Sequence, residues 1–486
     1  MKRITRLSSF LLLLIAVLVG SQLLPGQQEH PLAGADRRIL VEIAENSEQM
    51  ENLRYLTDRI GARLTGTEAL KRANEWTAQR FRDYGLSNVH LEAWTLEHSW
   101  RRGTARLRVV APEEEWLAAE VGGWSPNTPG PVRGPLVYVK AETKEELEAY
   151  RGKLGGAIVI TSEPRPRERK EERPLRPREP KPRRDFAARI QFARIRDDFF
   201  QEEGVQGILR DSDKNFGLFN MSVASFAHPY QPAPIPVAFL TPESYDLLWR
   251  LAQDGQGVEV ELEISGCEFS DGPVEVYNTV AEIPGSEKPD EVVLLGAHLD
   301  SWDLATGATD NGTGVSVVLE AARALSQLEL KPRRTIRFVL FSGEEQGLHG
   351  SRAYVEAHKD ELERISAVLV HDAGTGRVET IALQGNAQAY DMLRELLAPL
   401  RQMIGIADLS LRTLGGSDHA PFNRAGVPAF FCQQERATYR QTHHSQVDTF
   451  DKVIREDLLN GAQVMAVFAY NVAQAETMLP RRPKKE

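Results

Sequence analysis

The chain has 486 residues, a length that predicts two or three domains rather than one. Its hydrophobic content of 41% and aromatic content of 7% suit a globular protein with a sizeable core. The formal net charge of −10 argues against a nucleic-acid-binding protein, because such proteins need a basic surface.

The N-terminus predicts export. Three basic residues in the first six positions precede an unbroken apolar run at 10–19, which small residues and Pro25 follow. This order is typical of a secretory signal peptide, which we place at residues 1–25 without fixing the cleavage site. The alternative is an uncleaved anchor, but the run is shorter than the ~20 residues of a spanning helix. We therefore expect an exported protein, periplasmic or extracellular, with no stable membrane span after cleavage.

Only two cysteines are present, Cys267 and Cys432. They exclude a disulfide framework and a cysteine zinc cage, although one bridge between them stays open beside two buried thiols. Any bound metal ion must therefore be held by His, Asp and Glu.

The first part of the folded chain, at 36–102, has helical spacing of apolar residues. The segment 67–84 predicts an amphipathic helix that ends at Gly85, and a loop with the sequence GARLTG precedes it at 61–66. We expect this part to join the C-terminal half of the chain in one domain.

Residues 103–267 predict a β-rich insertion with a helix at 242–253. Short strand-like pieces lie between turn residues, at 105–110, 136–139, 157–160, 207–209, 237–240 and 258–264. The insertion contains a charged, proline-rich tract at 164–184, which we interpret as a solvated or disordered loop. A polybasic tract for membranes or nucleic acid is the alternative, but interleaved glutamates and the absence of aromatic residues disfavour it.

Residues 268–478 alternate apolar runs with helical patterns, which predicts a parallel sheet covered by helices on both faces. The expected strands are 292–297, 335–341, 367–370 and 427–432, and the expected helices are 314–328, 348–362, 387–403 and 455–474. The tail at 479–486 is expected to be disordered.

Residue types that bind metal ions fall at the ends of the expected strands and in two loops. In open α/β sheets, sites form at the carboxyl ends of the strands, so core packing is a poor explanation for these polar positions. The residues are His298, Glu344, Glu345 and Asp372 at strand ends, and Asp310 and His444 in loops.

Each residue type suits a task in a metal site. Histidine supplies a neutral imidazole nitrogen to zinc, and carboxylates supply oxygens. Two cations held ~3.5–4 Å apart need a shared carboxylate to offset their repulsion. One residue of the pair Glu344 and Glu345 can then bind metal while its neighbour faces the substrate water as a general base.

Four segments together resemble the M28 family of metallopeptidases. They are 296–314 (GAHLDSWDLATGATDNGTG), 338–350 (FVLFSGEEQGLHG), 371–374 (HDAG) and 442–449 (THHSQVDT). The phrases HLDSWD, GEEQG and HHS most resemble the plasma glutamate carboxypeptidase branch of that family. The resemblance extends over about residues 40–475.

The resemblance implies an α/β fold, a three-layer αβα sheet with mostly parallel central strands, formed by 36–102 and 268–478. It also implies that 103–267 is an inserted domain similar to the protease-associated domain, onto which the charged tract cannot be mapped. Two Zn²⁺ ions per chain are implied, one held by His298 and Asp372 and the other by Glu345 and His444. Asp310 would bridge both ions, Glu344 would act as general base, and Asp300 would orient the His298 imidazole.

Three further residues are possible substrate contacts. His443 is either a substrate contact or the neighbour of a ligand, Asp418 either shapes the pocket or caps a helix, and Tyr439 is a candidate for stabilising an oxyanion. The peptide bond between Asp310 and Asn311 is expected to be cis. The family bends the chain in this way, and flanking glycines ease the turn.

The expected function is an exopeptidase that removes N-terminal residues from peptides or splits dipeptides. One alternative is a glutaminyl cyclase, a zinc acyltransferase with one metal ion, and another is a receptor-like ectodomain without catalysis. The complete ligand set argues against both. The sequence leaves open the side-chain preference, the choice between aminopeptidase and dipeptidase, the native metal and the oligomeric state, a homodimer included.

Overall fold

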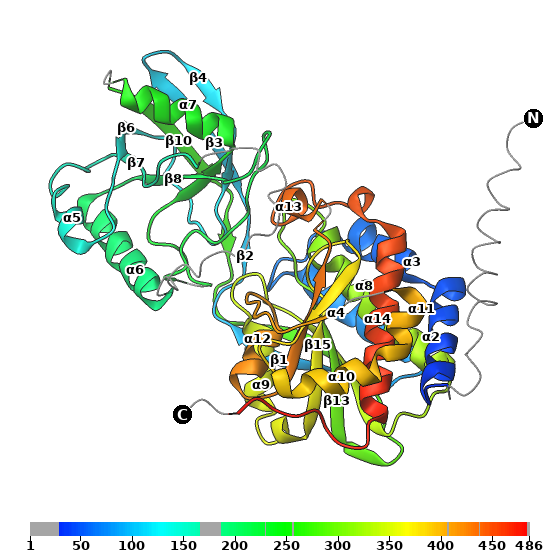
Figure 1. The fold of residues 1–486 in the computed structure, drawn as a ribbon. Helices are drawn as coiled ribbons and strands as arrows, with labels where there is room; N and C mark the ends of the chain where they lie inside the picture. Colours follow the sequence, from blue (N-terminus) through cyan, green and yellow to red (C-terminus); the bar gives the residue numbers. More distant parts are fainter. Residues whose placement is uncertain are drawn as a thin grey trace, which may run out of the picture.

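The computed structural model describes residues 29–165, 186–228, 230–254, 257–405, 408–436 and 438–483. The expected signal peptide and almost all of the charged tract lie outside the described residues. Figure 1 shows two lobes, each built on an eight-stranded sheet. We name residues 29–101 and 268–483 the large lobe and residues 104–265 the small lobe. A two-stranded ribbon, β2 (Trp100–Arg101) with β11 (Glu268–Phe269), lies where the chain passes between them.

The sheet of the large lobe has the strand order β1-β12-β14-β13-β15-β18-β16-β17. Its four central strands run parallel, which confirms the expected parallel centre. Antiparallel pairs flank them, β1 with β12 on one side and β16 with β18 on the other. The bounds are β1 (Ser87–Leu96), β12 (Val274–Ile283), β13 (Lys288–His298), β14 (Arg334–Phe341), β15 (Ile365–Val370), β16 (Val378–Ala382), β17 (Asp408–Ser410) and β18 (Ala429–Gln434).

Helices cover both faces of this sheet and make three layers (Figure 1). On one face, α8 (Thr313–Gln327) contacts both α4 (Glu68–Asp83) and α14 (Arg455–Gln474). Helices α9 (His349–Ala357) and α12 (His419–Arg424) contact each other on the opposite face. Helix α8 is buried from Thr313 to Leu325, as expected for a helix between the sheet and further helices. Helices α2 (Ala33–Asn46) and α3 (Gln49–Tyr55) pack outside it.

Two expectations for the large lobe are wrong in detail. The helix expected at 387–403 is divided into α10 (Tyr390–Leu396) and α11 (Ala398–Ile404), because Pro399 suits the first turn of a helix and cannot continue the preceding one. The tail is ordered as far as residue 483. Arg481 donates to the carbonyl oxygens of Leu362 and Ile365 at 2.7 and 3.1 Å, and Leu479 is buried.

The small lobe is rich in strands, in the order β4-β3-β10-β6-β7-β8-β9-β5, and shares no strand with the other eight-stranded sheet among the described residues. Its strands β6 to β9 run parallel, with a helix between β6 and β7 and another between β7 and β8, so it also has α/β character. The strands are β3 (Thr104–Ala111), β4 (Glu115–Leu117), β5 (Ala119–Val121), β6 (Val132–Tyr138), β7 (Ile158–Ile160), β8 (Gly207–Asp211), β9 (Val237–Leu240) and β10 (Glu259–Ser265). The helices are α5 (Lys144–Glu148), α6 (Phe186–Glu203) and α7 (Pro242–Gln253).

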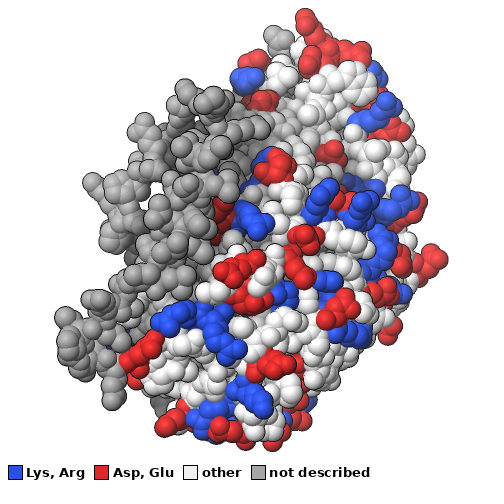
Figure 2. Space-filling model, turned by 90° about the vertical axis from the view of Figure 1, so that its right-hand side faces the viewer, with Lys and Arg blue, Asp and Glu red and all other residues white. Residues whose placement is uncertain are grey.

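Within the described ranges, no helix combines the length and the apolarity needed to cross a bilayer. Cys267 and Cys432 are buried free thiols and do not pair. Figure 2 shows the face that lies to the right in Figure 1, where basic and acidic side chains of the described residues are interspersed.

Candidate active site

Three neighbouring parallel strands deliver the polar residues that were expected to converge. His298 is the last residue of β13, the pair Glu344 and Glu345 follows β14, and Asp372 follows β15. Because β13 lies between β14 and β15 in parallel pairing, the three carboxyl ends meet at one edge of the sheet. The loop before α8 adds Asp310, and the loop after α13 (Tyr439–Thr442) adds His444.

Asp310 lies between two groups of candidate ligands. On one side, His298 Nε2 is 3.3 Å from Asp310 Oδ1 and 3.2 Å from Asp372 Oδ1. On the other side, His444 Nε2 is 3.5 Å from Asp310 Oδ2 and 2.7 Å from Glu345 Oε2. The two oxygens of one carboxylate therefore face different donor groups, and all five side chains converge in one place.

His443, the neighbour of His444, also contacts this cluster. Its Nε2 is 3.9 Å from Asp310 Oδ2, and its ring stacks on His444 with centroids 3.8 Å apart. The ligand atoms of His443, His444 and Asp310 could together hold an ion. Either His443 or Glu345 could therefore bind a metal ion together with His444 and Asp310.

The loop before α8 is shaped for this arrangement. The peptide bond between Asp310 and Asn311 is cis, as predicted. Asn311 Nδ2 donates to the carbonyl oxygen of His371 at 2.9 Å, and its Oδ1 accepts from the Gly314 amide at 2.9 Å. Gly314 has no room for a side chain, since a Cβ there would lie 2.4 Å from the His371 carbonyl oxygen.

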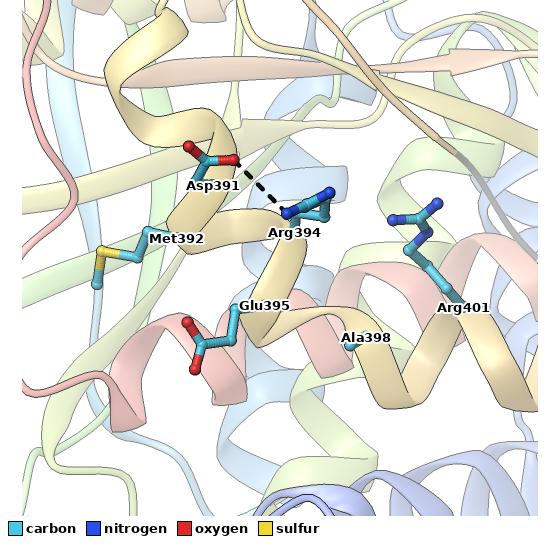
Figure 3. A pocket seen from close by; sticks show the side chains of 6 residues that line it. All are labelled: Asp391, Met392, Arg394, Glu395, Ala398 and Arg401. Atoms are coloured by element: carbon cyan, nitrogen blue, oxygen red, sulfur yellow. Dashed lines mark ion pairs between the residues drawn. The ribbon is translucent and has the colours of Figure 1, made fainter.

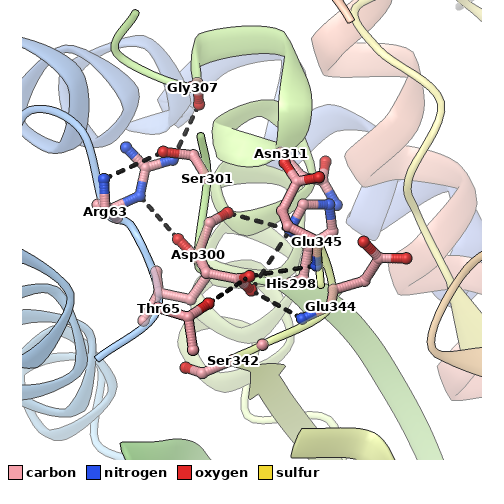
Figure 4. A network of polar contacts seen from close by, with 12 residues as sticks. Arg63, Thr65, His298, Asp300, Ser301, Gly307, Asn311, Ser342, Glu344 and Glu345 are labelled. Atoms are coloured by element: carbon pink, nitrogen blue, oxygen red, sulfur yellow. Dashed lines mark hydrogen bonds and ion pairs between the residues drawn. The ribbon is translucent and has the colours of Figure 1, made fainter. Parts of the chain in front are cut away.

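Asp300 lies beside His298, as expected, and also contacts the glutamate pair. Its backbone carbonyl lies 3.0 Å from His298 Nδ1, and its Oδ1 lies 3.6 Å from the same nitrogen. The carboxylate also accepts the backbone N–H groups of Glu344 and Glu345, both at 3.3 Å (Figure 4). Thr65 Oγ1 lies 3.0 Å from the same carboxylate. Asp300 therefore contacts the histidine through its carbonyl and its carboxylate, and holds the backbone of the glutamate pair through the carboxylate.

Sequence reasoning did not identify Arg63, which lies in the GARLTG loop and is fully buried. Its guanidinium donates to four backbone carbonyl oxygens, those of Leu299, Gly61, Thr306 and Gly307, at 2.7, 2.9, 2.8 and 2.9 Å. Figure 4 shows it beside the loop that runs from Asp300 to Gly307. One buried cation thus fixes both ends of the segment that leads to Asp310. An arginine in a short glycine-flanked loop was the available signal.

Glu344 differs from its neighbour in its contacts. Its carboxylate has no hydrogen bond or ion pair with the described residues, whereas Glu345 contacts His444. Burial raises the pKa of Glu344 well above its ordinary value; His298 opposes this rise, and the Asp372 and Asp418 carboxylates add to it. A raised pKa and a free carboxylate are the properties of a general base and acid.

Burial and neighbouring charges also shift the pKa values of Glu345, Asp310 and His444. Burial raises the pKa of Glu345 well above its ordinary value, and the neighbouring Asp310 carboxylate adds to the rise. For Asp310, burial opposes ionisation, but the hydrogen bond with His298 and the other imidazoles lower its pKa below the ordinary range. Burial lowers the pKa of His444, so its imidazole is favoured in the neutral form that binds metal.

This donor set fits divalent cations. Asp310 Oδ2 and Glu345 Oε1 are buried and accept no hydrogen bond from the described residues. Unpaired carboxylates that repel one another are costly in a protein interior unless cations neutralise them. Imidazole nitrogens and carboxylate oxygens are the ligands that zinc takes when no thiolate is present.

The three possible substrate contacts all lie beside this cluster. Burial raises the pKa of Asp418 to about 7, and its nearest charged neighbours include His298 and Asp372. Asp418 precedes α12, yet its side chain makes no capping hydrogen bond, so capping does not explain it. Tyr439 packs its ring against His443 with centroids 5.1 Å apart and covers Gly374.

A loop of the small lobe closes one side of the site. The Met221 amide donates to the His444 carbonyl oxygen at 2.8 Å, and Met221 joins Trp302, Asp310, Glu345 and His444 in lining a small pocket. Tyr230, also from this lobe, places its hydroxyl 3.4 Å from the Gly343 carbonyl oxygen. The lobes therefore meet at the candidate centre.

A wider hollow lies elsewhere, on α10 and α11 (Figure 3). Its residues include the exposed ion pair of Asp391 and Arg394 at 3.8 Å, but no histidine. It offers no group of metal ligands comparable to the one at the strand ends.

Known proteins resemble the chain in sequence and in fold. The family model of Peptidase family M28 matches residues 278–469. Carboxypeptidase Q from Rattus norvegicus is 31% identical over 431 residues, which cover 89% of this chain and 86% of the relative. The human carboxypeptidase Q is 30% identical over 89% of this chain and 86% of its own length.

Among solved structures, a peptidase M28 precursor from Shewanella amazonensis SB2B has a TM-score of 0.75 at 29% identity. The match covers 93% of this chain and 99% of the other. A zinc aminopeptidase from Bacillus subtilis has a TM-score of 0.63 at 20% identity, covering 87% and 94%, and shares the fold.

Proposed function

The chain belongs to peptidase family M28, and from that premise we propose that it is an exported exopeptidase with two zinc ions. It would hydrolyse the N-terminal residues of peptides, or dipeptides, with Glu344 as general base. That it is a metallopeptidase follows from the family. The number of ions, the residue roles and export belong to the proposal.

The position of Asp310 carries the proposal. Its two carboxylate oxygens face two donor groups, with His298 and Asp372 on one side and His444 on the other. Glu345 lies with His444 at 2.7 Å. We assign one ion to each side and Asp310 to both. When bound, such ions polarise a peptide carbonyl and acidify water.

The chain's own residues then move the proton. Glu344 is free of ion pairs within the described part of the chain and lies near His298 and Asp372, which act on its pKa. It would accept a proton from the attacking water and pass it to the leaving amine. Asp300 supports this by holding the backbone of Glu344 through its carboxylate. Tyr439, Asp418 and His443 lie beside the cluster and would contact the substrate.

We also propose that residues 103–267 form a distinct domain inserted into the peptidase, similar to the protease-associated domain. The ribbon of β2 and β11 at its two ends and its own sheet support this. The export proposal is supported by the basic and apolar N-terminus alone.

Metal content and substrate choice test the function together. We expect two zinc equivalents per chain by elemental analysis, and hydrolysis of a panel of dipeptides and chromogenic aminoacyl amides that chelation abolishes and zinc restores. One equivalent with cyclisation of N-terminal glutamine would instead indicate a glutaminyl cyclase. A correctly folded chain that binds no metal and hydrolyses nothing would indicate a receptor-like protein.

A further inference from the structure

The loop of the small lobe at 213–221 is anchored to the histidine-bearing loop at 443–446. The Phe219 amide donates to Gln446 Oε1 at 2.8 Å, and Gln446 Nε2 donates to the Gly217 carbonyl oxygen at 2.9 Å. The Met221 amide donates to the His444 carbonyl oxygen at 2.8 Å. Three hydrogen bonds between neutral groups therefore hold the two loops together.

Lys214 brings a cation to this contact. Its ammonium donates to the carbonyl oxygens of His443 and, at 3.4 Å, of Arg440. The side chain is half-buried, and no carboxylate of the described residues forms an ion pair with it. Its neighbour Asp213 pairs with Arg165 instead. Lys214 thus has carbonyl partners but no counter-ion.

This arrangement is unfavourable unless an anion arrives. A partly desolvated ammonium that has only neutral partners loses more hydration than it regains. The docking does not require the charge, because the other three hydrogen bonds already join the loops. The histidine-bearing loop that accepts from Lys214 also carries His444, whose Nε2 lies 3.5 Å from Asp310 Oδ2 at the centre of the candidate site.

We propose that Lys214 binds the free α-carboxylate of the substrate and so makes the enzyme selective for dipeptides. This inference rests on the proposed exopeptidase function. In a dipeptide the carboxylate lies one residue beyond the bond to be cleaved, a span of about 3.3–3.6 Å. An ammonium has three donors, and the carbonyls of His443 and Arg440 engage two of them, which leaves one for the substrate.

Kinetics with a matched substrate pair tests the inference. The zinc-loaded wild type, K214M and K214R are compared on alanyl-leucine and on its C-terminal amide. We expect the wild type to prefer the free acid. In K214M, KM for the acid should rise about 10–100-fold, as for loss of a charged hydrogen bond, with kcat nearly unchanged and the amide unaffected. K214R should retain most of the preference.

The control is K153M in the same lobe, because Lys153 also donates to a backbone carbonyl, that of Ala149 at 2.8 Å. It should leave both substrates unchanged. Equal loss on the acid and the amide in K214M would assign Lys214 a structural or oxyanion-binding role and overturn the inference. So would a wild type that prefers the amide.

Calorimetry separates this inference from the proposed function. Binding of the acid and the amide is measured on zinc-loaded E344Q with and without K214M. Weaker binding of the acid alone supports the carboxylate contact, and unchanged binding of the acid overturns it. If the wild type hydrolyses neither compound, the exopeptidase proposal fails, while the binding data still decide the role of Lys214.

Discussion

The carboxylate of Asp448 holds the backbone of Asp310, with Asp448 Oδ2 3.0 Å from the Asp310 amide nitrogen. Its other oxygen accepts both the amide and the hydroxyl of Thr309, at 2.6 and 2.7 Å. Asp448 is buried and belongs to the loop that also carries His444. The two loops that supply Asp310 and His444 are therefore fixed to each other by one carboxylate.

Replacing Asp448 by asparagine should weaken metal binding without removing a ligand. The asparagine side chain would place its own N–H₂ group opposite N–H or O–H groups that now donate to the carboxylate. At least one of those groups would be left unpaired, at a cost of about 1–3 kcal/mol. We expect zinc affinity to fall about 10–100-fold in D448N, as for other residues that support metal ligands. Competition with a fluorescent chelator measures this. Asp451→Asn, in the same segment but exposed, is the control, and an unchanged affinity in D448N would refute the role of Asp448.

Replacing Glu344 by glutamine should separate binding from catalysis. The variant keeps the size of the side chain and the backbone N–H that donates to Asp300. Its side-chain amide, however, cannot accept a proton from water. We expect kcat to fall about 10²–10⁴-fold with two zinc equivalents retained. Glu356→Gln on the exposed side of α9 is the matched control. Full turnover in E344Q would remove Glu344 as the base.

The adjacent histidines should differ in their effect on metal content. His444 Nε2 is 2.7 Å from Glu345 Oε2 and 3.5 Å from Asp310 Oδ2, whereas His443 Nε2 is 3.9 Å from Asp310 Oδ2. We expect H444Q to retain one zinc equivalent and H443Q to retain two, with a raised KM. Elemental analysis after gel filtration decides, and the reverse pattern would make His443 the ligand.

Replacing Arg63 by methionine should lower the free energy of unfolding of the protein. Of the four carbonyl oxygens that accept from its guanidinium, those of Leu299, Gly61 and Thr306 would lose their donor inside the protein, while that of Gly307 keeps the Gly312 amide. Each unsatisfied buried group costs about 1–3 kcal/mol, so we expect a loss of at least about 3 kcal/mol in the free energy of unfolding. R63K should recover only part of it, because one ammonium cannot reproduce the planar fork. Urea denaturation measures both, and a loss below 1 kcal/mol, on the order of one hydrogen bond, would contradict the expectation.

Asp36 should give the protein a pH-dependent stability. It is fully buried on α2, and burial raises its pKa from 3.8 to about 7, opposed by the hydrogen bond from Asn471. Between these values the unfolded chain releases a proton that the folded chain keeps, so stability falls as the pH rises from about 4 to about 7, by roughly 4 kcal/mol at most. In D36N this component disappears, since an amide does not titrate.

Urea denaturation between pH 4.5 and 7.5 compares D36N with the wild type. The stability of the variant relative to the wild type should increase with pH over this range and level off above it. Asp391→Asn, an exposed position on α10, should show no such trend. Parallel pH profiles for wild type and D36N would exclude Asp36 as the titrating group.

The sequence by itself determined the parallel centre of the large sheet and the polar residues at its carboxyl edge. Hydrophobic periodicity is local, so strands such as β13, β14 and β15 could be predicted from a few neighbouring residues. Because parallel strands present their carboxyl ends at one edge, the convergence of His298 and Asp372 followed from chain order alone.

Only the tertiary structure decided which residues hold these ligands in place. Arg63 and Asp448 act on backbone groups far away in sequence, and nothing in their local pattern shows which carbonyl or amide will turn toward them. The same holds for the carboxylate of Asp300, which accepts the backbone N–H groups of the glutamate pair in addition to lying 3.6 Å from His298 Nδ1. Long-range hydrogen bonds depend on how loops meet after the sheet has formed, and that information is not present in local periodicity.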